Sequence, residues 1–264
     1  MTVELQLSQY LTLLIQFHKK ILMHNKILIT GGSGKIGSHF IKSFSDHYKF
    51  RVLDLHPPQI QDTSIEYFQG NLTDKEYLIK ACENVDIVIH LGGIATPDAT
   101  FDDLLDANII GTKNIIDAAI AADCKKIIYA SSAQTIEGYP KDVQLNTEMP
   151  IKPGNLYGVS KCFGEALLSY HCFSSDLTAI CLRIGAYEFP EDFTEMNARD
   201  LSAYLHPDDL NQLLHLCIES KNIKFEILNA ISNNTYKRLD IQKTKLLTGY
   251  DPQYNSFDLF KLKK

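Results

Sequence analysis

The chain has 264 residues, of which 45% are hydrophobic and 22% are charged, so it can bury a sizeable core and is neither disordered nor fibrous. Its 26 basic and 32 acidic side chains give a formal net charge of -6, which argues against nucleic acid as a partner. No stretch approaches the roughly 20 apolar residues of a membrane-spanning helix, and the six cysteines contain no C-x-x-C pair, which fits free thiols in a reducing compartment.

Residues 1–24 precede the first predicted strand and are not expected to act as an export signal. Their short apolar stretch, residues 10–17, is followed by Lys19 and Lys20, which is the wrong order of charge for a secretory signal. Met23 stands at the usual distance of a native start from the first strand. We expect residues 1–24 to be an extension that is loosely packed or not native, and the protein to be cytoplasmic, without a membrane partner.

From residue 26 to residue 183, short apolar runs alternate with longer segments of helical spacing. Continuous apolar strands separated by helices are typical of a parallel sheet covered on both faces. The sequence therefore predicts an α/β protein with a doubly wound parallel sheet, the Rossmann fold. In chain order, the predicted elements are strand 26–30, helix 36–45, strands 50–54 and 65–68, helix 75–82, strand 85–90, helix 104–122, strand 126–131, helix 157–172 and strand 177–183.

The pattern loosens after residue 183. A loop surrounds Pro190, a helix is predicted over 208–218, and a strand over 224–228. We interpret residues 184–264 as the main source of a small C-terminal cap lobe over the carboxyl edge of the sheet, where such folds bind their ligands. Residues 25–264 are then expected to form a single domain. The nine histidines show no ligand spacing, so no metal site is predicted.

A glycine-rich turn joins the first predicted strand to the first helix. Residues 30–37 read T-G-G-S-G-K-I-G, with the motif glycines at Gly31, Gly34 and Gly37. These glycines let the backbone turn tightly and approach a pyrophosphate, which the free N–H groups and dipole of the helix N-terminus stabilise. The motif in this strand–turn–helix context predicts a dinucleotide site.

Asp54 ends the second predicted strand and indicates which dinucleotide binds. A carboxylate at this place can accept hydrogen bonds from the ribose hydroxyls of NAD and repel the 2′-phosphate of NADP. Lys35 works against this preference, because a basic residue nearby can bind a phosphate. The alternative for Asp54 is an ordinary turn residue at the end of a strand. We predict NAD as the cofactor.

A second motif, Tyr157-Gly-Val-Ser-Lys161, lies in a predicted helix. Side chains four residues apart share one helix face, so the Lys161 ammonium can lie near the Tyr157 phenol. A nearby cation favours the phenolate and so lowers the pKa of a tyrosine that acts as a base. Ser132 closes the fifth strand, where its hydroxyl can bind the same reacting oxygen. The alternative is an ordinary surface pair of Tyr157 and Lys161.

Together these residues resemble the short-chain dehydrogenase/reductase superfamily in its extended branch, the NAD-dependent epimerase/dehydratase family. The resemblance covers roughly residues 25–262 and rests on motifs that occur in the family's order. These are T-G-x-x-G-x-x-G at 30–37, His90-Leu91-Gly92-Gly93, Asn108-Ile109-Ile110-Gly111-Thr112, Ser132, and Tyr157 with Lys161.

The resemblance implies roles for individual residues. Tyr157 would be the general acid/base, Lys161 would lower its pKa and bind the nicotinamide ribose, and Ser132 would orient the substrate oxygen. Asn108 would hold a helix kink and a water of the proton relay. Helices 102–122 and 154–172 would form the interface of a homodimer or higher homo-oligomer. The cofactor contacts carried over are Gly31, Gly34, Lys35, Ile36, Gly37, Asp54, Asn71, Leu72, Leu91, Gly92, Gly93, Tyr157 and Lys161.

Within this branch the chain is most similar to the uronate dehydrogenases. The family's carboxylate-binding arginine maps onto Arg199, and the implied substrate residues are Ser132, Gln134, Tyr157 and Arg199. The shared stretches are His90–Ile94, Asn108–Gly111, Tyr157–Glu165, Arg183-Ile-Gly, and Arg199-x-Leu-Ser followed by Asp208-Asp209. The loop before Arg199 is longer than in that family, and Ala95, Ala133, Gln134 and Ala186 stand where it carries polar sugar-binding side chains.

The sequence thus predicts an NAD-dependent oxidoreductase of carbohydrate metabolism that acts on a sugar acid or a similar small hydroxylated substrate. One alternative is an epimerase or reductase of nucleotide sugars, for which residues 184–264 offer little room. A 4,6-dehydratase is disfavoured because no acidic pair follows Ser132. The third alternative, a non-catalytic NAD(P)-sensing protein, would normally have lost Tyr157 or Lys161, and both are present.

Overall fold

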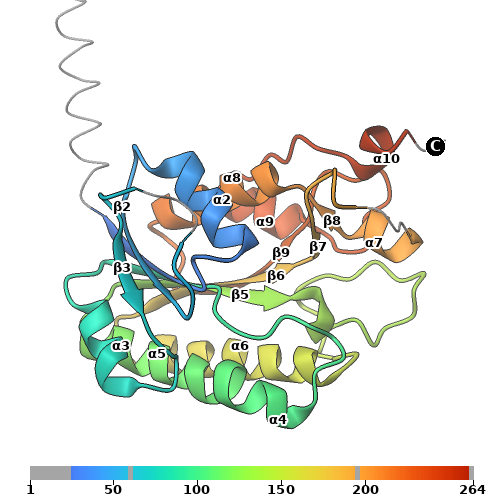
Figure 1. Ribbon diagram of the computed structural model, residues 1–264. Coiled ribbons are helices and arrows are strands. Elements are labelled where there is room, and N and C mark those ends of the chain that lie inside the picture. Colours follow the sequence, from blue (N-terminus) through green and yellow to red (C-terminus); the bar gives the residue numbers. More distant parts are fainter. Residues whose placement is uncertain (1–24, 59–61, 194–196, 262–264) are drawn as a thin grey trace, which may run out of the picture.

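The computed structural model describes residues 25–58, 62–193 and 197–261, so the expectation for residues 1–24 lies outside the described part (Figure 1). Its centre is a seven-stranded sheet in the order β3-β2-β1-β4-β5-β6-β9, in which every neighbouring pair is parallel. The strands are β1 (Lys26–Thr30), β2 (Lys49–Asp54), β3 (Glu66–Gln69), β4 (Ile87–His90), β5 (Lys126–Ser132), β6 (Thr178–Ile184) and β9 (Phe225–Ala230).

Helices cover both faces of this sheet, as predicted for a doubly wound fold (Figure 1). One face carries α2 (Lys35–Phe44), α8 (Pro207–Glu219) and α9 (Gln242–Thr248), and the opposite face carries α3 (Lys75–Cys82), α5 (Gly111–Ala121) and α6 (Leu156–Ser174). Each face has its own buried apolar cluster, one around Phe40 and the other around Leu168. None of the helices in the described ranges is long and apolar enough to cross a membrane.

The strand order reverses between β1 and β4, because β2 and β3 lie on one side of β1 and the later strands on the other. Thr30 and His90 are register partners at the carboxyl ends of these two strands. In open parallel sheets, ligands bind outside the carboxyl ends at this reversal point. The fold therefore places the glycine-rich turn, which follows Thr30, at the expected binding crevice.

Only part of residues 184–264 forms a cap. The strand β9 pairs with β6 as the seventh strand, and α8 and α9 pack on the main sheet, so these elements complete the central fold. The cap consists of the short parallel pair β7 (Ala186–Tyr187) and β8 (Tyr204–Leu205) with α7 (Ala198–Ser202) and α10 (Ser256–Leu259). It lies beyond the carboxyl ends of β5 and β6 (Figure 1).

The long predicted helix 104–122 is not continuous. It divides into α4 (Phe101–Leu104), the π-helix η1 (Leu105–Ile110) and α5, and Asn108 lies within η1. A π-helical turn is rare and occurs often at functional sites. The irregularity matches the helix kink that the family resemblance implies at Asn108.

A buried ion pair fixes α6 against the sheet. Arg183 on β6 donates from Nε and Nη2 to the two carboxylate oxygens of Glu165 on α6, each at 2.9 Å. Ser131 on β5 donates to the same carboxylate at 2.6 Å. The two charged side chains are 1% and 4% exposed. One carboxylate thus joins a helix to two adjacent strands at the end where the crevice opens.

We expect Glu165→Gln to destabilise the protein by about 3–5 kcal/mol, because it leaves the Arg183 charge buried without its counterion. Urea unfolding measures the loss. The matched control is Glu148→Gln, since the Glu148 side chain is 77% exposed and pairs with Lys243 at 2.8 Å. An exposed pair contributes about 0–1 kcal/mol. Equal losses in the two variants would contradict the anchoring role of Glu165.

Candidate active site

The glycine-rich turn has the backbone geometry of an anion cradle. Gly31 has φ +68°, and a Cβ there would lie 2.8 Å from the Gly92 Cα. A Cβ on Gly37 would lie 2.5 Å from the Gly32 Cα, so the third motif glycine allows α2 to pack closely on the turn. No side chain caps α2 at its start on Gly34. The first N–H groups of α2 therefore remain for a phosphate, and the turn fits the pyrophosphate of a dinucleotide.

Asp54 lies at the end of β2 beside this turn. Its Oδ2 accepts from the Ser33 backbone N–H at 3.0 Å, and its Oδ1 accepts from the His56 N–H at 3.1 Å. Each oxygen retains a lone pair for a ribose hydroxyl. Asp54 lines a cavity of about 320 Å³, here called the adenosine cavity, together with Gly31, Gly34, Asn71, Leu72, Leu91, Gly92 and Gly93.

Lys35 is the residue expected from the sequence to weaken the preference for NAD over NADP. Its Nζ lies 2.6 Å from Glu188 and 3.3 Å from Asp192, both in the segment that follows β7. Its hydrogen bond to Glu188 is the largest cause that raises the pKa of Lys35. The Lys35 charge is therefore matched within the protein, which leaves Asp54 as the charged group beside the ribose position.

Tyr157, Lys161 and Ser132 converge at the carboxyl end of β5, and all three are less than 10% exposed. The Lys161 Nζ lies 5.6 Å from the centre of the Tyr157 ring. Ser132 Oγ accepts from the Gln134 N–H at 3.2 Å, and the Ser132 hydroxyl also interacts with the Tyr157 phenol, so the two hydroxyls face the same point. The three line a cavity of about 460 Å³, here called the catalytic cavity, which shares Gly31, Gly34, Leu91 and Gly93 with the adenosine cavity.

Burial governs the protonation of this group. Burial raises the pKa of Tyr157, and the Ser132 side chain opposes the shift. Burial also lowers the pKa of Lys161, to about 8. Desolvation thus sets the direction of both shifts, because the charged forms of both groups lose water. The positive nicotinamide ring of bound NAD would add the missing stabilisation of a phenolate.

Both amide hydrogens of Asn108 form hydrogen bonds within the protein. Its Oδ1 accepts from the Ile94 N–H at 2.7 Å, and its Nδ2 donates to the Ile94 carbonyl at 2.9 Å and to Ser160 Oγ at 3.1 Å. The amide therefore has no donor left for a relay water. Asn108 holds the loop after β4 against α6, one residue from Lys161, and we regard it as a positioning residue.

His90 is likewise a positioning residue. Its ring bonds the hydroxyls of Thr30 at 2.6 Å and Thr112 at 3.1 Å. Burial, with a smaller effect of the Lys161 charge, lowers the pKa of His90 to about 3. The neutral ring joins β1, β4 and α5 directly beneath the crevice.

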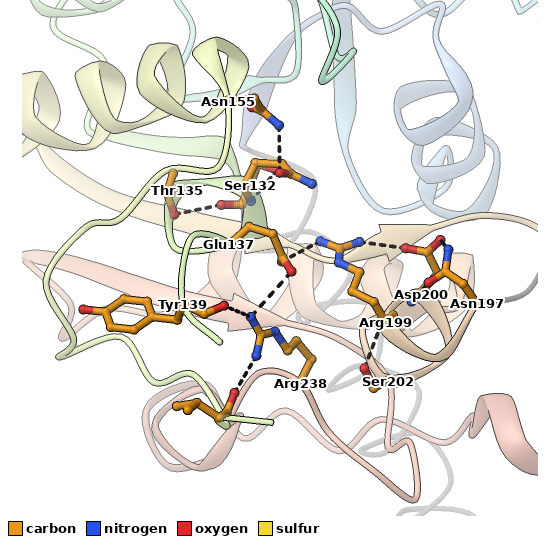
Figure 2. Close-up of polar contacts among 12 residues, drawn as sticks. Ser132, Thr135, Glu137, Tyr139, Asn155, Asn197, Arg199, Asp200, Ser202 and Arg238 are labelled. Atoms are coloured by element: carbon orange, nitrogen blue, oxygen red, sulfur yellow. Dashed lines mark hydrogen bonds and ion pairs between the residues drawn. The ribbon is translucent and has the colours of Figure 1, made fainter. Parts of the chain in front are cut away.

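Arg199, mapped from the resemblance, lies on α7 and lines the catalytic cavity. Its guanidinium is paired with Glu137 and Asp200 (Figure 2). Gln134 also lines the cavity, and its Oε1 accepts from Asn155, the N-cap of α6, at 2.9 Å. The structure brings Ser132, Gln134, Tyr157, Lys161, Arg199, Lys35 and Ile36 to the catalytic cavity, whereas Gly37 and Asn108 do not line it.

Two residues near the site carried no signal in the sequence. Tyr187 of β7 lines the catalytic cavity, and its buried hydroxyl has no hydrogen-bond partner in the structure. Glu137 contacts Arg199 across 62 positions of sequence. Neither belongs to a local motif, because both reach the site through the packing of the cap on the loop after β5.

A Rossmann sheet with a dinucleotide cradle and a buried Tyr, Lys and Ser defines a nucleotide-dependent oxidoreductase of the short-chain type. The chain belongs to the NAD dependent epimerase/dehydratase family, whose model matches residues 27–224.

Characterised relatives cover nearly the whole chain. It is 32% identical to an NAD-dependent glucose-6-phosphate dehydrogenase of Haloferax volcanii, over 89% of this chain and 95% of that protein. It is 31% identical to an L-arabinose 1-dehydrogenase of the same organism, over 88% and 97%. A variant of uronate dehydrogenase from Agrobacterium tumefaciens, solved with NAD, superposes with a TM-score of 0.82 at 28% identity, covering 91% and 90%. These comparisons confirm the predicted fold, the family and an NAD-dependent dehydrogenase.

We expect wild-type protein to bind NAD more tightly than NADP, and Asp54→Ala to weaken NAD binding about 10–100-fold, because one or two charge-assisted hydrogen bonds are lost. Asp54→Asn is the matched variant, since it keeps the size of the side chain and removes the charge that repels the 2′-phosphate. Titration calorimetry with both dinucleotides provides the measurement. Equal or tighter binding of NADP by the wild type would overturn the role of Asp54.

Proposed function

We propose that this protein oxidises a hydroxyl group of a small sugar with NAD as the hydride acceptor. The observation that carries the proposal is the convergence of Tyr157, Lys161 and Ser132 on a cavity continuous with the dinucleotide cradle. The relatives support it, because they are named as dehydrogenases of glucose 6-phosphate, L-arabinose and uronate.

The proposed chemistry assigns one task to each residue. Ser132 donates a hydrogen bond to the substrate oxygen and holds that oxygen beside Tyr157. Tyr157, as phenolate, removes the proton of the substrate hydroxyl while the carbon loses a hydride, and a carbonyl forms. Lys161 stabilises the phenolate by its charge. Bound NAD supplies the hydride acceptor. The buried, preorganised cluster keeps water from the reacting oxygen.

The size of the catalytic cavity favours a monosaccharide. Its volume of about 460 Å³ has to hold the nicotinamide end of the cofactor as well as the substrate. A nucleotide sugar would require a second large site, and the short β7–β8 pair with α7 supplies only a small cap. The epimerase alternative is therefore the weaker one.

A sugar acid is the second candidate substrate. It is favoured by Arg199 in the cavity wall and by the similarity to a uronate dehydrogenase. A guanidinium binds a carboxylate best when both of its terminal nitrogens face it. In this structure those nitrogens face Glu137 and Asp200. A neutral sugar requires no exchange of these partners.

We further propose that the protein is a cytoplasmic homodimer. Leu156, Val159, Tyr170 and Phe173 are exposed and recur at helical spacing along one side of α6. An apolar stripe of this kind marks a protein interface. The six cysteines are all free and buried, which suits a reducing compartment.

Tyr157→Phe is expected to lower kcat about 10²–10⁴-fold, because it removes the general base. Binding of NAD and the melting temperature should change little, since only one hydroxyl is lost. NADH formation with a panel of aldoses and uronic acids measures the effect. Tyr236→Phe, which removes a hydroxyl from an exposed side chain away from the catalytic cavity, is the control. Undiminished turnover by Tyr157→Phe would refute the assignment.

A further inference from the structure

The substrate arginine is part of a closed charge cluster at the rim of the catalytic cavity. Glu137 follows the short helix η2 (Ala133–Thr135) and lies between two arginines (Figure 2). Its Oε2 lies 3.0 Å from Nη2 of Arg199, and its Oε1 lies 3.5 Å from Nη2 of Arg238. The Arg199 and Glu137 side chains are 21% and 17% exposed, so water screens the pair only partly.

Arg238 is committed to holding the loop that follows η2. Its Nη1 donates to the carbonyls of Pro140 at 2.7 Å and Val143 at 2.6 Å, and its Nη2 donates to the Tyr139 carbonyl at 3.1 Å. The Arg238 side chain is 2% exposed. Arg238 therefore fixes the position of Glu137, and Glu137 in turn reaches the cavity-lining Arg199.

The cluster has balanced charges. Arg199 Nη1 donates to Asp200 Oδ1 at 2.9 Å, so the two terminal nitrogens of Arg199 face two different carboxylates. Arg199 and Arg238 contribute two positive charges, and Glu137 and Asp200 contribute two negative ones. A substrate carboxylate that used the remaining N–H donors of Arg199 would approach both of these carboxylates. Like charges at such distances repel, and the repulsion weakens binding.

The same arrangement suits hydroxyl groups. Two of the five N–H donors of a guanidinium are used by the carboxylates, and three remain. The carboxylate oxygens also keep lone pairs. A sugar hydroxyl is both donor and acceptor, so it can use both kinds of group, whereas a carboxylate is an acceptor only.

We propose that Glu137 is a specificity-determining residue, which neutralises Arg199 and so directs this enzyme to uncharged sugars and away from sugar acids. The inference rests on the proposed sugar dehydrogenase activity and deepens it. It differs from the use of Arg199 that the resemblance to uronate dehydrogenases implies: Arg199, held by Glu137, donates N–H hydrogen bonds to sugar hydroxyls and does not bind a carboxylate with both terminal nitrogens.

The test compares wild type with Glu137→Gln on neutral aldoses and on the uronic acids of the same configuration. We expect wild type to prefer the neutral sugar at least about tenfold in kcat/KM, and the variant to raise the acid-to-neutral ratio at least about tenfold. The gain should appear mainly in KM for the acid, because a carboxylate away from the reacting carbon is bound equally before and during reaction. Glu148→Gln, which removes the charge of an exposed side chain, is the control and should leave the acid-to-neutral ratio unchanged.

Two further variants separate specificity from folding. Adding Arg199→Met to Glu137→Gln should abolish the gain on acids, since the freed cation is then absent. If Glu137→Gln does not fold, Asp200→Asn tests the same charge balance from the other side of Arg199. An unchanged melting temperature and retained binding of NAD show that each variant is folded.

The outcomes separate the role of Glu137 from the dehydrogenase activity itself. A wild type that prefers the uronic acid, or a folded Glu137→Gln with an unchanged acid-to-neutral ratio, overturns the role of Glu137 and leaves the dehydrogenase intact. Absence of NADH formation by wild type with every sugar tested overturns the proposed function, and the inference with it.

Discussion

The catalytic geometry depends on one buried ion pair. Glu165 lies four residues after Lys161 and eight after Tyr157, so all three share one side of α6. The carboxylate is held by Arg183 of β6 and by Ser131 of β5, next to Ser132. Arg183 and Ser131 are fixed within the sheet. A rotation of α6 would therefore expose the Glu165–Arg183 ion pair to water or separate its two buried charges. Tyr157 and Lys161 are thereby held facing the end of β5.

Burial disfavours the phenolate form of Tyr157, and bound NAD would counter this effect. Dehydration raises the pKa of Tyr157 and lowers that of Lys161 to about 8, so burial disfavours the charged form of each group, although Lys161 stays mostly protonated near pH 7. A positive ring bound between the glycine turn and Tyr157 would favour the phenolate. In the proposed reaction, bound NAD would thus help Tyr157 to lose its proton.

The sequence allowed prediction of those features that local patterns determine. The seven strands of the main sheet, the glycine turn and the Tyr157–Lys161 pair follow from periodicity and short spacings. The π-helical turn around Asn108 could be expected only through the family resemblance, because it depends on bonds to Ile94 and Ser160. The contact between Glu137 and Arg199 could not be predicted, because it forms only when the cap packs against the loop after β5. Substrate choice thus depends on the part of the chain with the weakest local signal.

Transfer of a labelled hydride tests the central claim most directly. An aldose carrying deuterium at the carbon to be oxidised is incubated with the protein and NAD, and the products are analysed by mass spectrometry. A sugar dehydrogenase moves the label into the reduced cofactor, one deuterium for each oxidised sugar released. If the label returns to a sugar of altered configuration and no reduced cofactor accumulates, the protein is an epimerase and the account is wrong.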